Sequence, residues 1–224
     1  MEDIFKKYVK RSSNPHLSII LHKDYENFII DIIKYKNPKN ILDVGGGKGW
    51  SKIINEFPNI NYSVLDFKNS TENPKINFIE GDITSKSLSI TDKYDIIFTK
   101  DTFEHILNPW DATDNILNLL NEDGIFIFLA PFSWRYHASP FDTYRYSHVG
   151  AQYMFEHKNK MKKIFSGYIP FPPINGFWPN KKDFTIDSKP FLNNLETIYV
   201  GQKDSSYIFT QSVLDSDFSW NHSS

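Results

Sequence analysis

The hydrophobic positions of the first 36 residues recur at steps of three and four along the chain. This spacing is typical of the buried face of an amphipathic helix, and it predicts one or two helices over residues 1–36. The positions that carry the pattern are Phe5, Tyr8, Val9, Ile19, Ile20, Phe28, Ile29, Ile32 and Ile33. We therefore expect a helical segment in front of the main body of the fold.

From residue 37 onward, short apolar runs alternate with amphipathic stretches. The runs predicted as strands are residues 41–44, 61–66, 77–79, 94–99, 125–130, 163–169 and 197–202. The stretches predicted as helices are residues 48–57, 111–120 and 151–160. Strands interleaved with helices favour a doubly wound α/β sheet with helices on both faces. The pattern thus predicts a mostly parallel sheet of seven strands.

The regular pattern fades after residue 131, where aromatic, proline and histidine residues crowd together. Residues 170–190 are too irregular to assign, and the aromatic side chains of the tail predict that it packs on the body. A chain of 224 residues fits one domain. Its expected parts are a helical segment (1–36), a core (37–131), an irregular region with the last strands (132–203) and a tail (204–224).

Composition narrows the class of protein. The formal net charge is −2, so no strong positive field favours a nucleic acid partner. The chain has no cysteine, which removes disulfides, thiolate metal sites and cysteine nucleophiles. No apolar stretch approaches the roughly 18 residues of a membrane span, and the charged residues 1–10 do not form a signal peptide. We expect a cytoplasmic protein without membrane insertion, and leave self-association into a homo-oligomer open.

A glycine-rich turn follows the first predicted strand of the core. Asp43 ends that strand, and Gly45, Gly47 and Gly49 follow it at alternate positions. Glycine allows a sharp turn and lets a ligand approach the backbone. A dinucleotide fingerprint requires a third glycine at the position of Trp50, so the spacing disfavours a nicotinamide-dependent oxidoreductase, which stays as an alternative.

Further acidic residues stand where the next strands end. Asp66 closes the second core strand, where a carboxylate can accept hydrogen bonds from both hydroxyls of a ribose. Asp82 follows Gly81 after the third strand, and residues 94–106 end the fourth strand with the pair Glu104 and His105. The carboxyl ends of parallel strands border one crevice, so these residues are expected to lie together.

This ordered set over residues 36–131 resembles the Rossmann-like class I methyltransferases, in which an acidic residue precedes G-x-G-x-G. The resemblance implies S-adenosylmethionine as cofactor, with the glycine loop around its methionine part, Asp66 on its ribose and Asp82 on its adenine. The residues expected to bind the cofactor are Asp43, Gly45, Gly46, Gly47, Gly49, Asp66, Phe67, Asp82, Ile83 and Lys100.

The stretch of residues 131–146 is unusually rich in aromatic and arginine side chains, which suit sugar rings and anionic groups. It resembles the H-x-x-P-x-D-x-x-R segment of methyltransferases associated with surface polysaccharide synthesis. The matching residues are His137, Pro140, Asp142 and Arg145. The residues expected to contact the acceptor are Trp134, Arg135, Tyr136, Tyr144 and Arg145. The alternative is a well-packed loop that covers the sheet.

A sugar hydroxyl is a weak acid, so its methylation calls for a base. We predict His137 as this base, His105 as its substitute and Asp142 as the group that orients the imidazole; a structural role for His105 stays open. No metal is expected, although Asp101, Glu104 and His105 could gather magnesium or manganese.

The predicted function is transfer of a methyl group from S-adenosylmethionine to a sugar or glycan hydroxyl. N-methylation of an amino sugar, methylation of another small metabolite and a non-catalytic cofactor-binding module are the alternatives.

Overall fold

A computed structural model describes residues 1–11, 18–137, 140–157, 161–171, 185–186, 189–190 and 194–210. Most of the irregular residues 170–190 and the end of the tail, including Phe218 and Trp220, lie outside this part of the chain. The helices are α1 (Glu2–Tyr8), α2 (His22–Lys36), α3 (Ser51–Glu56), the 3-10 helix η1 (Phe103–His105), α4 (Pro109–Leu119) and α5 (His148–Glu156). None of the described helices is long and apolar enough to cross a bilayer.

The strands of the main sheet are β1 (Val9–Arg11), β2 (Ser18–Ile20), β3 (Asn40–Val44), β4 (Asn61–Asp66), β5 (Ile76–Glu80), β6 (Tyr94–Lys100), β7 (Leu120–Ser133), β8 (Met161–Phe171) and β11 (Asn194–Lys203). Two short strands, β9 (Thr185–Ile186) and β10 (Lys189–Pro190), pair separately. The main sheet has the order β1-β2-β8-β11-β7-β6-β3-β4-β5. All seven predicted strands are therefore present, and the doubly wound α/β fold is confirmed.

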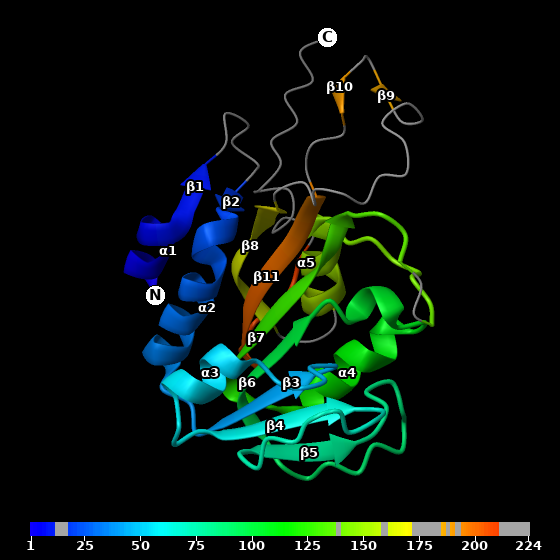
Figure 1. Ribbon diagram of the computed structural model, residues 1–224. Helices are drawn as coiled ribbons and strands as arrows, with labels where there is room; N and C mark the ends of the chain where they lie inside the picture. The colour runs from blue at the N-terminus through cyan, green and yellow to red at the C-terminus, as the bar shows by residue number, and fades with distance from the viewer. Residues whose placement is uncertain are drawn as a thin grey trace.

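The central strands β7, β6, β3, β4 and β5 run parallel to one another, whereas β11 is antiparallel to both of its neighbours (Figure 1). The order of the strands reverses between β3 and β6, because β4 and β5 extend the sheet on one side and β7 on the other. In an open α/β sheet, ligands bind outside the carboxyl ends of the strands at such a reversal. The topology thus places a binding crevice beyond β3 and β6.

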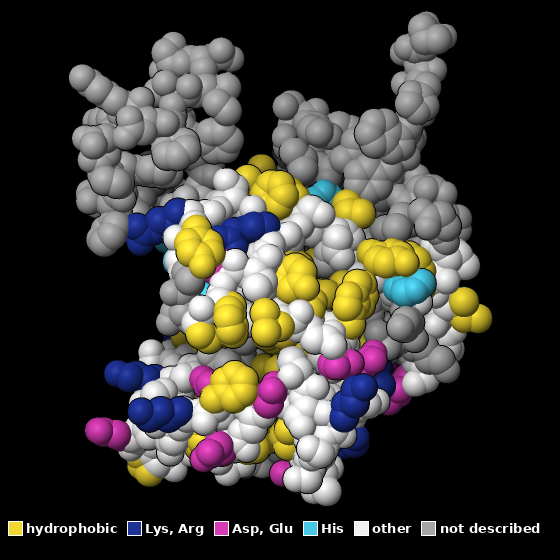
Figure 2. Space-filling model, turned by 90° about the vertical axis from the view of Figure 1, so that its right-hand side faces the viewer, with side chains coloured by type: hydrophobic (Ala, Val, Ile, Leu, Met, Phe, Trp, Pro, Cys, Tyr) yellow, Lys and Arg dark blue, Asp and Glu magenta, His cyan; other side chains and the backbone are white. Residues whose placement is uncertain are grey.

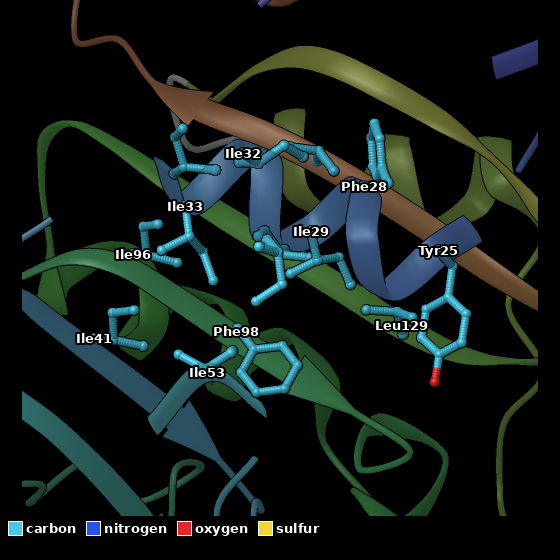
Figure 3. Packing of buried hydrophobic residues seen from close by; sticks show 14 of the residues in the cluster. Tyr25, Phe28, Ile29, Ile32, Ile33, Ile41, Ile53, Ile96, Phe98 and Leu129 are labelled. Carbon is cyan, nitrogen blue, oxygen red and sulfur yellow. The ribbon is translucent and has the colours of Figure 1, made fainter. Parts of the chain in front are cut away.

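Helices cover both faces of the sheet, as the pattern predicts. On one face, Phe28, Ile29 and Ile33 of α2 pack over Phe98 of β6 and Leu129 of β7 (Figure 3). On the other face, α4 and α5 bury apolar side chains against the opposite sides of the same strands. Both layers remove apolar surface from water, which is the main stabilising contribution to folding.

The count of seven strands is wrong, because the amino-terminal segment adds two. Val9 and Ile20 pair across an antiparallel ladder between β1 and β2, and Ile19 of β2 pairs with Tyr168 of β8. The spacing of hydrophobic residues predicts helices at these positions, and this prediction is wrong. Short runs of β-branched residues fit both the helical repeat and the strand repeat of hydrophobic positions. Here they form strands, because β2 pairs with the free edge of β8.

The predicted tail packing is confirmed for its described part. Tyr207 donates a hydrogen bond to Glu156 over 3.4 Å, and the ring of Phe209 lies 6.0 Å from that of Tyr153. Both partners belong to α5, so residues 204–210 cover the outer side of that helix.

Candidate active site

A cavity of about 410 Å³ opens where β3, β4, β5 and β6 end. Its lining includes Gly45 after β3, Asp66 of β4, Asp82 after β5, and Thr102 and His105 after β6. Figure 2 shows the side of the molecule toward which the arrows of β3, β4 and β5 point in Figure 1, with hydrophobic side chains gathered on its surface between charged ones. Asp66, Phe67, Asp82 and Ile83 were predicted to lie together, and all four line this cavity.

The glycine loop behind the cavity depends on backbone conformations that favour glycine. Gly45, Gly47 and Gly49 have φ angles of 75°, 54° and 73°. The N–H of Gly45 donates to the carbonyl of Leu65 over 2.8 Å, and the N–H of Gly47 donates to Asp66 over 3.2 Å. The loop is thereby tied to β4. Its left-handed residues also delay the start of α3 to Ser51, three residues later than predicted.

Asp43 lies beneath this loop and supports it. Its side chain is buried, Tyr62 donates a hydrogen bond to Oδ2 over 2.6 Å, and the N–H of Trp50 donates to the Tyr62 hydroxyl oxygen over 3.0 Å. The other oxygen, Oδ1, has no hydrogen-bond partner among the described residues. Burial raises the pKa of Asp43 to about 7, although the Tyr62 hydrogen bond opposes this. Tyr62 was not identified from the sequence, where it resembles any other buried strand residue.

Replacing Asp43 with asparagine is expected to flatten the pH dependence of stability. The pKa of Asp43 is about 7 in the fold against an ordinary 3.8, so the folded state binds this proton more tightly than the unfolded state. Its contribution is full below pH 3.8 and is lost as pH rises toward about 7, a change on the order of 4 kcal/mol. Urea unfolding of both proteins across pH 4–8 measures how the free energy of unfolding changes with pH. An equal change in both proteins would contradict the raised pKa of Asp43.

Asp66 and Asp82 each hold a turn at the mouth of the cavity. Asp66 accepts a hydrogen bond from the N–H of Phe67 over 2.7 Å, and Asp82 accepts from the N–H of Thr84 over 2.8 Å. The side-chain amide of Asn115 on α4 donates to the carbonyl of Ile83 over 2.7 Å and fixes this loop. Asn115 is a supporting residue that sequence reasoning missed, because nothing in a helix pattern shows which loop a polar side chain reaches.

Lys100 lies apart from the other predicted cofactor residues, since it does not line the cavity. Its ammonium pairs with the carboxylate of Asp101. Burial lowers the pKa of Lys100, but the charges of Asp101 and Glu196 outweigh burial and raise it overall. The geometry therefore favours an ion pair with Asp101 for Lys100.

Glu104, His105 and His137 form a compact cluster beside the cavity. The side chain of Glu104 is fully buried, and its Oε1 lies 3.6 Å from Nε2 of His105 and 3.7 Å from Nε2 of His137. The two imidazole rings are 5.1 Å apart and nearly perpendicular. Burial raises the pKa of Glu104, and the two histidines oppose it. Of the three residues that could gather a metal by sequence, Glu104 and His105 lie together here, and the third member of the cluster is His137 rather than Asp101.

Asp142 contacts His137, as predicted for an orienting group. Its Oδ2 accepts a hydrogen bond from the backbone N–H of His137 over 2.7 Å and lies 3.3 Å from Nδ1 of the ring. Both carboxylate oxygens also accept hydrogen bonds from the guanidinium of Arg145. Hydrogen bonding to Arg145 lowers the pKa of Asp142 to about 2, although burial opposes it.

Among the residues expected to contact an acceptor, Arg145 is hydrogen-bonded within the chain itself. Besides Asp142, its guanidinium donates to the carbonyls of Trp134 and Arg135. Tyr144 donates to the carbonyl of Leu107 over 3.2 Å, whereas Tyr136 is 74% exposed. The arginine therefore links Trp134 and Arg135 to Asp142, while the ring of Tyr136 remains largely exposed.

The strand order, the glycine loop and the two strand-end carboxylates define a Rossmann-like protein built to bind a nucleotide-type cofactor. The family model of the methyltransferase domain matches residues 21–166, which is more than half of the chain. The chain belongs to this family. The predicted class, the Rossmann-like S-adenosylmethionine-dependent methyltransferases, is thus confirmed.

Among curated proteins, malonyl-[acyl-carrier protein] O-methyltransferase 2 of Ilyobacter polytropus is 35% identical over 102 residues, which are 40% of this chain and 38% of that protein. The chain thus spans about two fifths of the length of this relative.

Among solved structures, an S-adenosylmethionine-dependent methyltransferase from Clostridium acetobutylicum ATCC 824 has a TM-score of 0.53 at 15% identity, covering 81% of this chain and 91% of that one. N-methyltransferase NodS from Bradyrhizobium japonicum WM9, in complex with S-adenosyl-L-homocysteine, has a TM-score of 0.55 at 10% identity and covers 81% and 86%. At these identities the likeness concerns the fold.

Proposed function

We propose that this protein transfers the methyl group of S-adenosylmethionine to an oxygen atom of a small molecule or glycan, with a sugar hydroxyl as the acceptor. The observation that carries this proposal is the arrangement of one cavity between two groups of residues. Asp66 at the end of β4 and Asp82 after β5 belong to the strands on one side of β3, and His105, from the cluster with Glu104 and His137, follows β6 on the other side; all three residues line the cavity.

The cavity fits the cofactor of this family. Its volume of about 410 Å³ lies within the roughly 300–1,000 Å³ of small-molecule sites. A Cβ atom on Gly45 would overlap the side chain of Thr102, so the turn is closed to any larger residue there. We assign the ribose hydroxyls to Asp66, the adenine to Asp82 and Ile83, and the amino acid part to the loop above Asp43, whose Oδ1 lacks a hydrogen-bond partner among the described residues.

When bound, the cofactor supplies a methyl group on a sulfonium sulfur, so that the C–S bond breaks as the C–O bond forms and the electron pair stays on sulfur. The protein then has to hold the acceptor oxygen in line and accept its proton. We assign proton removal to the cluster of Glu104, His105 and His137, because His105 lines the cavity and both imidazoles are held in fixed orientations.

Oxygen as the acceptor atom is supported by the curated relative, which is named as an O-methyltransferase. A sugar acceptor is supported by aromatic side chains beside the cavity, since flat rings pack well against sugar rings. Phe141 lines the cavity and is 49% exposed, and Phe67, which also lines it, is 71% exposed. The alternative acceptor is an amino sugar or another metabolite. It is supported by NodS, which is an N-methyltransferase with this fold.

Replacing Asp66 with alanine is expected to weaken the binding of S-adenosylhomocysteine by 10-fold or more while the protein remains folded. The variant loses the carboxylate assigned to two hydroxyl hydrogen bonds, and bonds to charged groups contribute about 1.5–3 kcal/mol each. Asp92→Ala is the control, because Asp92 is an exposed acid away from the cavity lining.

Isothermal titration calorimetry gives both affinities, and circular dichroism checks the fold. Transfer assays with hydroxyl sugars, amino sugars and malonyl thioesters then separate the acceptor classes. If the folded wild-type protein binds neither S-adenosylmethionine nor its demethylated product, the proposed function is wrong. If it binds both but methylates amines only, the oxygen acceptor is wrong.

A further inference from the structure

The buried carboxylate of Glu104 accepts no hydrogen bond from another residue of the described chain. Its side chain has no exposed surface. Moving a carboxylate out of water without a partner costs several kcal/mol. A contrasting case is Glu156, which is equally buried but accepts hydrogen bonds from Tyr199 and Gln152. The position of Glu104 therefore calls for a positively charged partner.

The two histidines turn the same nitrogen toward this carboxylate. Nδ1 of His105 is hydrogen-bonded to the carbonyl oxygen of Phe141, and Nδ1 of His137 lies 3.1 Å from the carbonyl oxygen of Arg135. A carbonyl oxygen can only accept, so each Nδ1 carries a proton. In the neutral ring, Nε2 then has a free lone pair, and both Nε2 atoms face Oε1 of Glu104. Three electron-rich atoms thus point at one another.

We propose that Glu104, His105 and His137 bind one divalent transition metal ion. Ligand atoms about 2.0–2.2 Å from a metal ion lie roughly 3–3.6 Å from one another. Here Oε1 of Glu104 is 3.6 and 3.7 Å from the two Nε2 atoms, and all three groups can offer atoms within 4.8 Å of one another. Two imidazoles and one carboxylate suit zinc, cobalt or manganese better than magnesium or calcium.

The surroundings of the two histidines resemble the outer shell of a metal site. Carbonyl oxygens that accept from Nδ1 fix the tautomer and the ring orientation of a metal-binding histidine. His137 has additional support, because Asp142 holds its backbone N–H and is itself held by Arg145. The segment that carries His137 is therefore positioned before any ion arrives.

Of the three proposed ligands, His105 lines the cavity, whereas Glu104 and His137 lie behind it, so an acceptor would reach the ion from the His105 side. This step rests on the proposed function: an acceptor hydroxyl that binds the ion at this side loses its proton to water more readily than a free one. The ion would then replace His137 as the group that activates the acceptor, and His105 and His137 would serve as its ligands.

The test is metal binding by the full chain after dialysis against a chelator. Titration with Co²⁺ followed by absorption, and with Zn²⁺ followed by calorimetry, is expected to give one ion per chain and cobalt bands typical of imidazole ligands. Glu104→Gln and His137→Gln are expected to weaken binding by more than 100-fold, beyond the roughly 10–100-fold effect of losing an outer-shell partner. Glu156→Gln and His157→Gln are the matched controls, with unchanged affinity expected.

Glu104→Gln also removes an unpaired buried charge, so without metal its thermal midpoint is expected to equal or exceed that of the wild type. If the folded wild type binds neither ion, or if all four variants bind equally, the cluster is a histidine–carboxylate ion pair and the inference is wrong. Binding of S-adenosylhomocysteine to the same metal-free samples separates this outcome from failure of the proposed function, because cofactor affinity does not require the ion.

Discussion

Replacing Gly46 with alanine is expected to lower the stability of the protein by about 2 kcal/mol and to weaken S-adenosylhomocysteine binding by about 30-fold or more. A Cβ atom at this position would overlap all three atoms of the Asp43 carboxyl group. The carboxyl group cannot simply step aside, because Tyr62 binds it and Trp50 binds Tyr62. The loop above Asp43 has to move instead, and the cavity changes shape with it.

Gly150→Ala is the control for this substitution. Gly150 lies in α5, away from the cavity lining, and a Cβ there would approach the hydroxyl of Ser147 at 3.0 Å. Alanine forms helices better than glycine by up to about 1 kcal/mol, so this variant is expected to keep or gain stability. Urea unfolding measures the stability of both variants, and calorimetry measures their affinity for S-adenosylhomocysteine. A Gly46→Ala protein with wild-type affinity would show that the loop does not shape the cofactor site.

The parts of the molecule that the sequence predicts are those that depend on local pattern. The strands around Leu42 and Ile97 are continuous apolar runs, and the turn at Gly45 needs a backbone angle that glycine adopts readily. Each of these features follows from a few neighbouring residues. For this reason the core strands, the glycine loop and the strand-end acids were all predicted together at one edge of the sheet.

The features that the sequence did not predict depend on partners distant in the chain. Glu104 and His137 are 33 positions apart, and their approach requires the ends of β6 and β7 to lie side by side. Arginine side chains usually lie exposed, yet the side chain of Arg145 is paired with the buried carboxylate of Asp142. The motif spacing identified these residues as important, but only the packing of two loops decides which atoms meet.

Two buried carboxylates at this site illustrate how differently a fold can treat the same group. Asp43 has Tyr62 as a donor on one oxygen and supports the backbone of the glycine loop. Glu104 has no donor among the other described residues and faces two histidines. The hydrogen bond from Tyr62 stabilises the charged form of Asp43 and partly offsets its burial, whereas a carboxylate that faces two imidazole lone pairs is stabilised by a cation. Asp43 therefore shapes the loop assigned to the cofactor, whereas Glu104 belongs to the cluster proposed to hold a metal ion.

Replacing Asp142 with alanine is expected to lower the free energy of unfolding by about 3 kcal/mol, because removal of one partner leaves the other charge uncompensated in a largely buried pair. The Asp142 side chain is fully buried, and that of Arg145 is 27% exposed, so the low end of the usual 3–5 kcal/mol range applies. Asp114→Ala, an exposed acid on α4, is the control and is expected to change stability by less than about 0.5 kcal/mol.

A double-mutant cycle separates the ion pair from the rest of the effect. Arg145→Ala alone is also expected to destabilise the protein, and the double variant is expected to lose less than the sum of the two single losses, by about 0.5–3 kcal/mol. Urea unfolding of all four proteins measures this coupling. Additive losses would mean that Asp142 acts mainly through its hydrogen bond to the backbone of His137. In that case the position of His137, rather than the anchoring of Arg145, is what Asp142 secures.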